Sequence, residues 1–198
     1  MTVSKYNNLF SIVLLNSVVP LSKSLNKYLS QRIVVKSFKK GDFIISKGEV
    51  PDRLYIIRKG LVRGFFMHNN NEITTWASVD NELVTSISGF FRNNAALENI
   101  QCLEDTQTES LSFEELHFTL NNFPEMERLY RTLLEQYYIE AEYRALAARI
   151  PIAKDRYDYY MKIVNPEIFE RLPKKYLASL LNMRPETLSR LQTDCSII

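Results

Sequence analysis

Residues 174–190, near the C-terminal end of the chain, have the pattern of two short helices joined by a tight turn. Ala178 and Leu181 fall on one face of the first helix, and the small Ala178 lets a second helix approach closely. Asn182 tolerates the left-handed backbone that ends a helix, and Pro185 suits the first turn of the next one. The segment therefore predicts a helix-turn-helix.

The outer side of the second predicted helix is charged. Within residues 171–190 the positive side chains outnumber the single carboxylate of Glu186. Lysine and arginine bind phosphates, and side chains on such a helix reach base edges. The alternative is a plain helical hairpin, which occurs in many folds. The predicted DNA-binding residues are Arg184, Glu186, Thr187, Arg190, Lys174 and Lys175.

Composition sets broad limits on the chain. It has 198 residues, enough for one large or two small domains, with 45% hydrophobic and 24% charged residues. The net charge of +2 is close to neutral, so a DNA-binding function depends on local clustering of charge. Cys102 and Cys195 form neither a metal-binding nor a disulfide pattern, which favours a reducing, cytoplasmic setting.

The N-terminal region has an apolar run over residues 9–15 that follows Lys5. Asn16 interrupts this run, and no small-residue cleavage site follows before Pro20. We therefore expect an amphipathic helix packed on the rest of the protein rather than a signal peptide. The run is too short to cross a membrane, and no membrane partner is expected.

Residues 33–112 have the sequence pattern of β structure. Short runs of β-branched and aromatic residues alternate with Gly-containing or polar turns at near-regular spacing. This spacing predicts an antiparallel roll or barrel. The expected strands cover residues 33–35, 43–45, 54–57, 61–66 and 73–76.

The pattern becomes helical beyond Phe113. Residues 124–149 contain no Gly, and no Pro after Pro124, and they carry more than one apolar stripe. Such a helix needs two neighbours: the roll and a second copy of itself, although packing within the monomer alone is the alternative. Pro151 marks a break. We expect three units: 1–123, 124–149 and 150–198.

Two blocks of sequence stand out: Lys40-Gly41-Asp42-Phe43-Ile44-Ile45-Ser46-Lys47-Gly48-Glu49 with Leu54 to Val62, and Leu177-Ala178 through Glu186-Thr187-Leu188-Ser189-Arg190. In this order they resemble the cyclic-AMP receptor protein/fumarate-nitrate regulator (Crp/Fnr) family of bacterial transcription regulators. The resemblance implies an α+β fold with an N-terminal cyclic-nucleotide-binding-like antiparallel β-roll (jelly roll). A long dimerisation helix and a C-terminal helix-turn-helix, winged-helix-like with a truncated wing, would follow.

The resemblance also implies a partner and a mode of binding. Two copies would join along residues 124–149 and place their second helices in successive major grooves of a roughly palindromic operator in double-stranded DNA. At the matching positions Arg190 would bind guanine and Glu186 would accept a hydrogen bond from cytosine. Thr187 and Arg184 would contact phosphates or neighbouring bases.

The chain departs from the cyclic-AMP-binding members of that family. Glu82 keeps the carboxylate that takes the ribose, but residues 94–99 lack the arginine that pairs with the phosphate. Arg92 is the only nearby cation, so the candidate ligand-binding residues are Glu82 and Arg92. We therefore expect that the effector is not cyclic AMP and that an unidentified small molecule binds between the roll and the long helix.

The sequence also argues against a cofactor or an enzyme. The N-terminal region has no cysteine for an iron-sulfur cluster. His68 and His117 are too few for a cupin metal site, and we expect loop and surface positions for them rather than haem ligation. No catalytic motif is found. We expect no cofactor, no metal and no catalytic residue.

The sequence thus predicts a homodimeric, effector-responsive transcription regulator. The alternative is a ligand-sensing or protein-binding relative that has lost productive DNA binding. Two departures keep that alternative open: Arg184 offers no capping oxygen, and the eight residues after Arg190 lack a basic continuation and room for a full wing. A third option is a cyclic-nucleotide-responsive regulator that uses Arg92.

Overall fold

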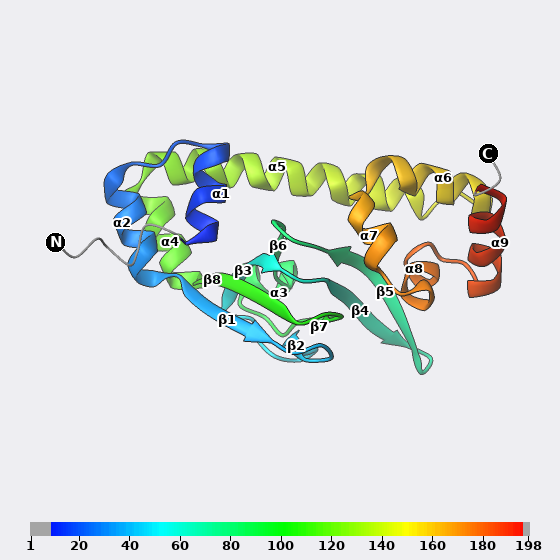
Figure 1. Cartoon of the computed structure of the whole chain (residues 1–198). Helices are drawn as coiled ribbons and strands as arrows, with labels where there is room; N and C mark the ends of the chain where they lie inside the picture. The colour runs from blue at the N-terminus through cyan, green and yellow to red at the C-terminus, as the bar shows by residue number, and fades with distance from the viewer. Residues whose placement is uncertain (1–8, 196–198) are drawn as a thin grey trace.

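The computed structural model describes residues 9–195 and shows a β-roll bordered by one long helix (Figure 1). Three helices, α1, α2 and α4, gather at one end of the long helix α5, and α6 to α9 gather at the other. The elements are α1 (Phe10–Val18), α2 (Lys23–Arg32), β1 (Val34–Phe38), β2 (Phe43–Ile45), β3 (Arg53–Lys59), β4 (Val62–His68), β5 (Asn71–Ser78), β6 (Leu83–Val84), α3 (Ile87–Arg92), β7 (Asn99–Cys102), β8 (Thr106–Ser112), α4 (Phe113–Asn122), α5 (Pro124–Ala147), α6 (Ala153–Ile163), α7 (Pro166–Arg171), α8 (Lys174–Leu180) and α9 (Pro185–Cys195).

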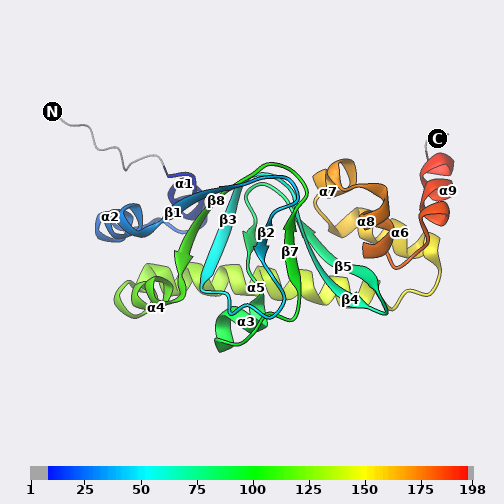
Figure 2. The same cartoon turned by 90° about the horizontal axis from the view of Figure 1, so that it is seen from below.

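The roll consists of two antiparallel four-stranded sheets. Their strand orders are β1-β8-β3-β6 and β2-β7-β4-β5. Ile57, Val62 and Ile100 are fully buried in a hydrophobic cluster to which both sheets contribute. Viewed from below, the strands lie across α5, which runs the length of the molecule behind them (Figure 2). Helix α5 therefore runs along one side of the roll (Figures 1 and 2).

One turn and one close approach need particular residues. Asn69 and Asn70 both have positive φ, 47° and 61°, and join β4 to β5 as the two-residue turn that favours such a hairpin. Gly64 lies against the indole of Trp76, and a Cβ at this position would come within 2.1 Å of the ring. Glycine at position 64 therefore allows Trp76 to cover β4.

Helix α1 is fastened to the roll by one carboxylate. Glu109 of β8 is buried, and its carboxylate accepts hydrogen bonds from the backbone N–H of Phe10 at 3.0 Å and of Ser11 at 2.7 Å. The hydroxyl of Ser11 also donates to Glu109. An anion at the first turn of a helix satisfies N–H groups that have no partner within the helix. Glu109 thus fixes where α1 begins.

The long helix changes character along its length. Met126 and Leu129 are buried against α1, α2 and α4, and Ala147 is buried against the C-terminal helices. Between them, from Leu134 to Glu140, every residue is exposed, although several are apolar. Among the described residues, the middle of α5 is therefore only partly covered.

The predicted fold class is confirmed for the antiparallel roll, the long helix and the helices that follow it, whereas the helix-turn-helix with its truncated wing stays a prediction. The strands expected from the sequence lie in the roll, the expected long helix is α5, and the N-terminal apolar run forms α1. The bounds differ: α5 ends at Ala147, earlier than the predicted end at residue 149. The short helices α3 and α7 were not expected. The predicted division at residues 123 and 149 stays a prediction, and Lys5 and the last three residues lie outside the described part.

Glu109→Ala removes the acceptor for the first N–H groups of α1. We expect the free energy of unfolding to fall by about 2 kcal/mol, because buried donors lose their partner, and hydrogen exchange in α1 to accelerate. Urea denaturation and exchange mass spectrometry measure both effects. Glu170→Ala, at an exposed position of α7, is the control. Unchanged exchange in α1 would contradict this role of Glu109.

Candidate nucleic-acid interface and effector cavity

Helices α8 and α9 are joined by a tight turn where the sequence predicts a helix-turn-helix. Asn182 adopts a left-handed conformation with φ 48°. Its N–H donates to the carbonyl of Ser179, and the N–H of Met183 donates to the carbonyl of Ala178, each at 3.0 Å. This pair of bonds is the Schellman motif that ends a helix. The sequence prediction for Asn182 is confirmed.

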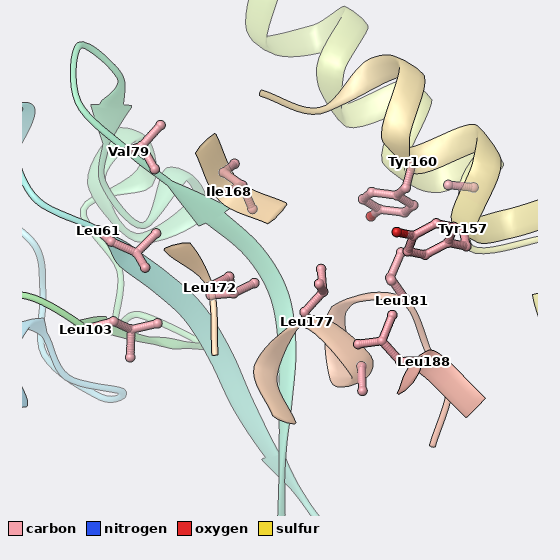
Figure 3. Packing of buried hydrophobic residues seen from close by; sticks show 12 residues of the cluster. Leu61, Val79, Leu103, Tyr157, Tyr160, Ile168, Leu172, Leu177, Leu181 and Leu188 are labelled. Carbon is pink, nitrogen blue, oxygen red and sulfur yellow. The ribbon is translucent and has the colours of Figure 1, made fainter. Parts of the chain in front are cut away.

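The inner faces of both helices join one core with the roll. Leu177, Ala178 and Leu188 are buried in a cluster that also contains Leu61 and Leu103 of the roll. Figure 3 shows these leucines from the two regions together with side chains of α6 and α7. Because the inner faces are occupied, the outer faces of α8 and α9 are the ones available to a partner.

The residues expected to contact DNA lie on these outer faces. Arg184, Glu186 and Arg190 are exposed on α9 or just before it, and Thr187 is half-buried. Lys174 and Lys175 are exposed in the first turn of α8. No ion pair joins Arg184 or Arg190 to another residue between 9 and 195 whose side chain is described. The structure therefore leaves both guanidinium groups available.

Arg171, which adds to the positive charge of this region in the sequence, has a different role. Its guanidinium donates to Glu104 at 2.7 Å, to Asp80 at 3.4 Å and to the carbonyl of Gly60 at 2.8 Å, all in the roll. It also pairs with Glu167 at 2.6 Å. These partners raise the pKa of Arg171 above its ordinary value. Arg171 therefore attaches the C-terminal helices to the roll.

A second arginine attaches α8 to the roll. Arg63 of β4 is 1% exposed, and its guanidinium carbon lies 3.6 Å from the ring centre of Tyr176 on α8 and 4.1 Å from that of Phe65. Glu72 and Gln101 accept its hydrogen bonds at 2.5 and 2.9 Å. A desolvated cation between two aromatic faces contributes about 2 kcal/mol. The sequence carries a signal for this role of Arg63, because the residue is a cation in the middle of an apolar strand.

A third arginine holds the turn of the helix-turn-helix. Arg156 of α6 is 6% exposed and donates to the carbonyl of Leu181 at 2.6 Å and to that of Asn182 at 2.9 Å. It also donates to the carbonyl of Ile150. It thus joins the end of α8 to the break after α5. In the sequence Arg156 looks like a surface cation on a helix, so nothing indicates this role.

A cavity of about 430 Å³ lies between the roll and α5. Side chains from α1, α3, α5, α6 and both sheets line it, and most are apolar, among them Leu83, Phe91, Leu133 and Tyr160. Leu134, Tyr137 and Tyr143 also line it yet stay more than one third exposed, so it is open along α5. The expected space between roll and long helix is therefore present.

Glu82 and Arg92, the two candidate ligand residues, are not brought together. Glu82 lines the cavity and accepts hydrogen bonds from the amide of Asn165 at 3.2 Å and the N–H of Val79 at 3.3 Å. Burial raises the pKa of its carboxyl above the usual range, and the charge of Glu140 adds to this effect. Arg92 is exposed at the end of α3 and does not belong to the cavity lining.

Comparison with known proteins agrees with this geometry. The family model for the cyclic nucleotide-binding domain matches residues 35–122. FixK2 from Bradyrhizobium japonicum is similar over 83% of this chain and 85% of its own, at 15% identity and a TM-score of 0.70. The catabolite activator protein of Thermus thermophilus is similar over 92% and 86%, at 20% identity and a TM-score of 0.56.

A third similar structure is CLP of Xanthomonas campestris, a c-di-GMP-responsive global regulator. It is similar over 88% of this chain and 91% of its own, at 14% identity and a TM-score of 0.66. The chain has the Crp/Fnr fold. The resemblance inferred from the two sequence blocks is thus confirmed at the level of the fold. No curated protein sequence matches the chain.

Within residues 9–195, no three His, Cys, Asp or Glu side chains come together as metal ligands. His68 ends β4 and His117 lies on α4, both exposed, as expected for loop and surface residues. The same part of the chain contains no helix of the length and apolar character needed to span a bilayer.

Arg156→Met removes every donor that holds the carbonyls of Leu181 and Asn182. We expect the free energy of unfolding to fall by about 2 to 3 kcal/mol, because these carbonyls lose their partners at a buried site. Arg149→Met changes an exposed arginine close by and should have little effect. Chemical denaturation measures both variants. Equal stability of the two variants would show that Arg156 does not hold the turn.

Proposed function

We propose that this Crp/Fnr-fold chain is a homodimeric, DNA-binding transcription regulator whose effector is not cyclic AMP. The observation that carries the proposal is the exposed position of Arg184 and Arg190 on a helix-turn-helix whose inner face is fully occupied. Arginine on such a helix suits guanine in the major groove, and the flanking Lys174 and Lys175 suit phosphates. The solved structures similar to this chain include an activator protein and a global regulator.

The exposed middle of α5 supports the proposed dimer. Leu134, Tyr138 and Leu146 are spaced by multiples of four residues and are 39%, 73% and 49% exposed. Apolar side chains in one row on an exposed helix favour pairing with a second helix. A second copy on this face would relate the two α9 helices by a twofold axis, which calls for a roughly palindromic operator.

The cavity supports an effector other than cyclic AMP. A cyclic nucleotide carries a phosphate that needs a cationic partner when it is buried. Arg92 faces solvent outside the cavity, and Glu82 is bound by Asn165 and Val79. An anion placed beside Glu82 would therefore meet a carboxylate, and Arg144, the one arginine among the described lining residues, already lies 4.0 Å from Glu140.

Selection from a random duplex library tests DNA binding, and we expect it to enrich palindromic sites. Arg190→Ala should weaken binding to the selected site about 10- to 100-fold and relax its sequence preference, since a bidentate base contact contributes about 1–3 kcal/mol. Fluorescence anisotropy over a salt series measures this. Arg128→Ala, at an exposed position near the opposite end of α5, is the matched control.

The outcome that contradicts DNA-binding regulation is equal, weak binding to every duplex by the unaltered protein. That result would favour the alternative of a relative that has lost productive DNA binding. Lys174→Ala should instead lower affinity for all duplexes alike and reduce the salt slope by about one, because it contacts phosphate only.

Tyr138→Glu tests the dimer. The side chain is largely exposed in a single copy, so folding should be preserved, whereas a buried carboxylate at the dimer interface should weaken association at least about tenfold. Val13→Glu alters another exposed apolar residue, on α1, and should leave association unchanged. Sedimentation velocity measures the association constant. Equal association of both variants would exclude this face of α5.

A further inference from the structure

The cavity between the roll and α5 has a distinct chemical character. Its volume of about 430 Å³ lies within the range of small-molecule sites. Apolar side chains come from three helices that are far apart in sequence, and they enclose most of the surface. This group includes Leu14 and Leu15 of α1, Ile87 and Phe91 of α3, and Met126, Tyr130 and Leu133 of α5. Such walls suit the apolar body of a ligand.

The charges around this space are mostly negative. Among the described lining residues the carboxylates are Glu82, Glu109 and Glu140, and the only lysine or arginine is Arg144. Glu109 is fully engaged with the start of α1. Arg144 lies 4.0 Å from Glu140 and 5.6 Å from the ring centre of Tyr137. An anionic ligand would therefore have to displace Arg144 from its present partners.

Glu82, just before β6, and Glu140, on α5, both line the cavity. The negative charge of Glu140 contributes to the raised pKa of Glu82, so the two carboxylates repel one another across this space. The hydrogen bonds that Glu82 accepts from Asn165 and Val79 are long, at 3.2 and 3.3 Å, and the side chain of Ser78 also donates to it. A cation placed between these residues would relieve the repulsion and gain a charge-assisted hydrogen bond.

We propose that this cavity binds a small molecule with an apolar body that ends in an amine, with Glu82 and Glu140 receiving the ammonium group. The inference deepens the proposed function, because it names the chemical class of the effector. The inference depends on shape and charge together. The apolar walls bind the hydrocarbon part of the ligand, and the two carboxylates favour a positive charge at its polar end.

The chain carries its own reporter for this site. Trp76 is the single tryptophan of the sequence, and it lines the cavity. Its indole N–H donates to Glu98 at 2.9 Å. A ligand that enters the cavity contacts or displaces this ring, so the fluorescence of the whole protein reports binding without any label and without DNA.

The test compares three probes with the same apolar tail: octylamine, 1-octanol and octanoate. We expect octylamine to change Trp76 fluorescence with saturation and to bind at least about tenfold more tightly than octanoate, with 1-octanol in between. Glu82→Gln should bring the affinities for octylamine and octanoate to within about threefold. Glu170→Gln, an exposed carboxylate on α7 outside the cavity lining, should leave the order unchanged.

Glu140→Gln serves as the second variant, because Glu140 is about half exposed and its replacement leaves folding intact. It should also reduce the preference for octylamine. Equal or tighter binding of octanoate by the unaltered protein, or no saturable signal with any probe, would overturn the inference. Since no DNA takes part, such a failure is separate from a failure of the proposed DNA binding.

Discussion

The position of the helix-turn-helix depends on one apolar core shared between the roll and the C-terminal helices. Leu61, Val79 and Leu103 of the roll pack in the same buried cluster as Leu172, Leu177 and Leu188 (Figure 3). Each fully buried leucine contributes about 1.5–3 kcal/mol through removal of apolar surface from water. The C-terminal helices are therefore packed against the roll and are not attached only through their connection to α5. Their orientation is set by the sheet.

Three arginines surround this core, and their directional contacts fix how the roll and the C-terminal helices are oriented. Arg63 stacks between aromatic rings of the roll and α8, Arg171 reaches the acidic turns of the roll, and Arg156 holds the turn before α9. Hydrophobic contact alone permits sliding, whereas hydrogen bonds and ion pairs of this kind define one register. The N–H of Thr74 on β5 donates to the hydroxyl of Ser179 on α8 at 3.0 Å. Two residues further along β5, Trp76 borders the cavity. Strand β5 therefore contacts both the cavity and helix α8 of the candidate nucleic-acid interface.

The sequence predicted the elements better than their connections. Periodicity and turn residues identified the roll, the long helix and the helix-turn-helix, because each leaves a local signal such as Asn182 before Pro185. The exposed positions of Arg184 and Arg190 followed from the same periodicity. The roles of Arg156 and Arg171 could not be predicted, since their partners are carbonyls and carboxylates brought close only by the tertiary fold. The separation of Arg92 from the cavity is likewise a matter of packing around α3, which local sequence does not encode.

Native-state hydrogen exchange over a low urea series tests the shared core most directly. It compares the slowest amides of β5 with those of α8, and the exchange free energies measure how each element opens. If roll and C-terminal helices share one core, both sets converge on one opening free energy with a common urea dependence. Opening of α8 at low free energy while β5 stays closed would contradict this account.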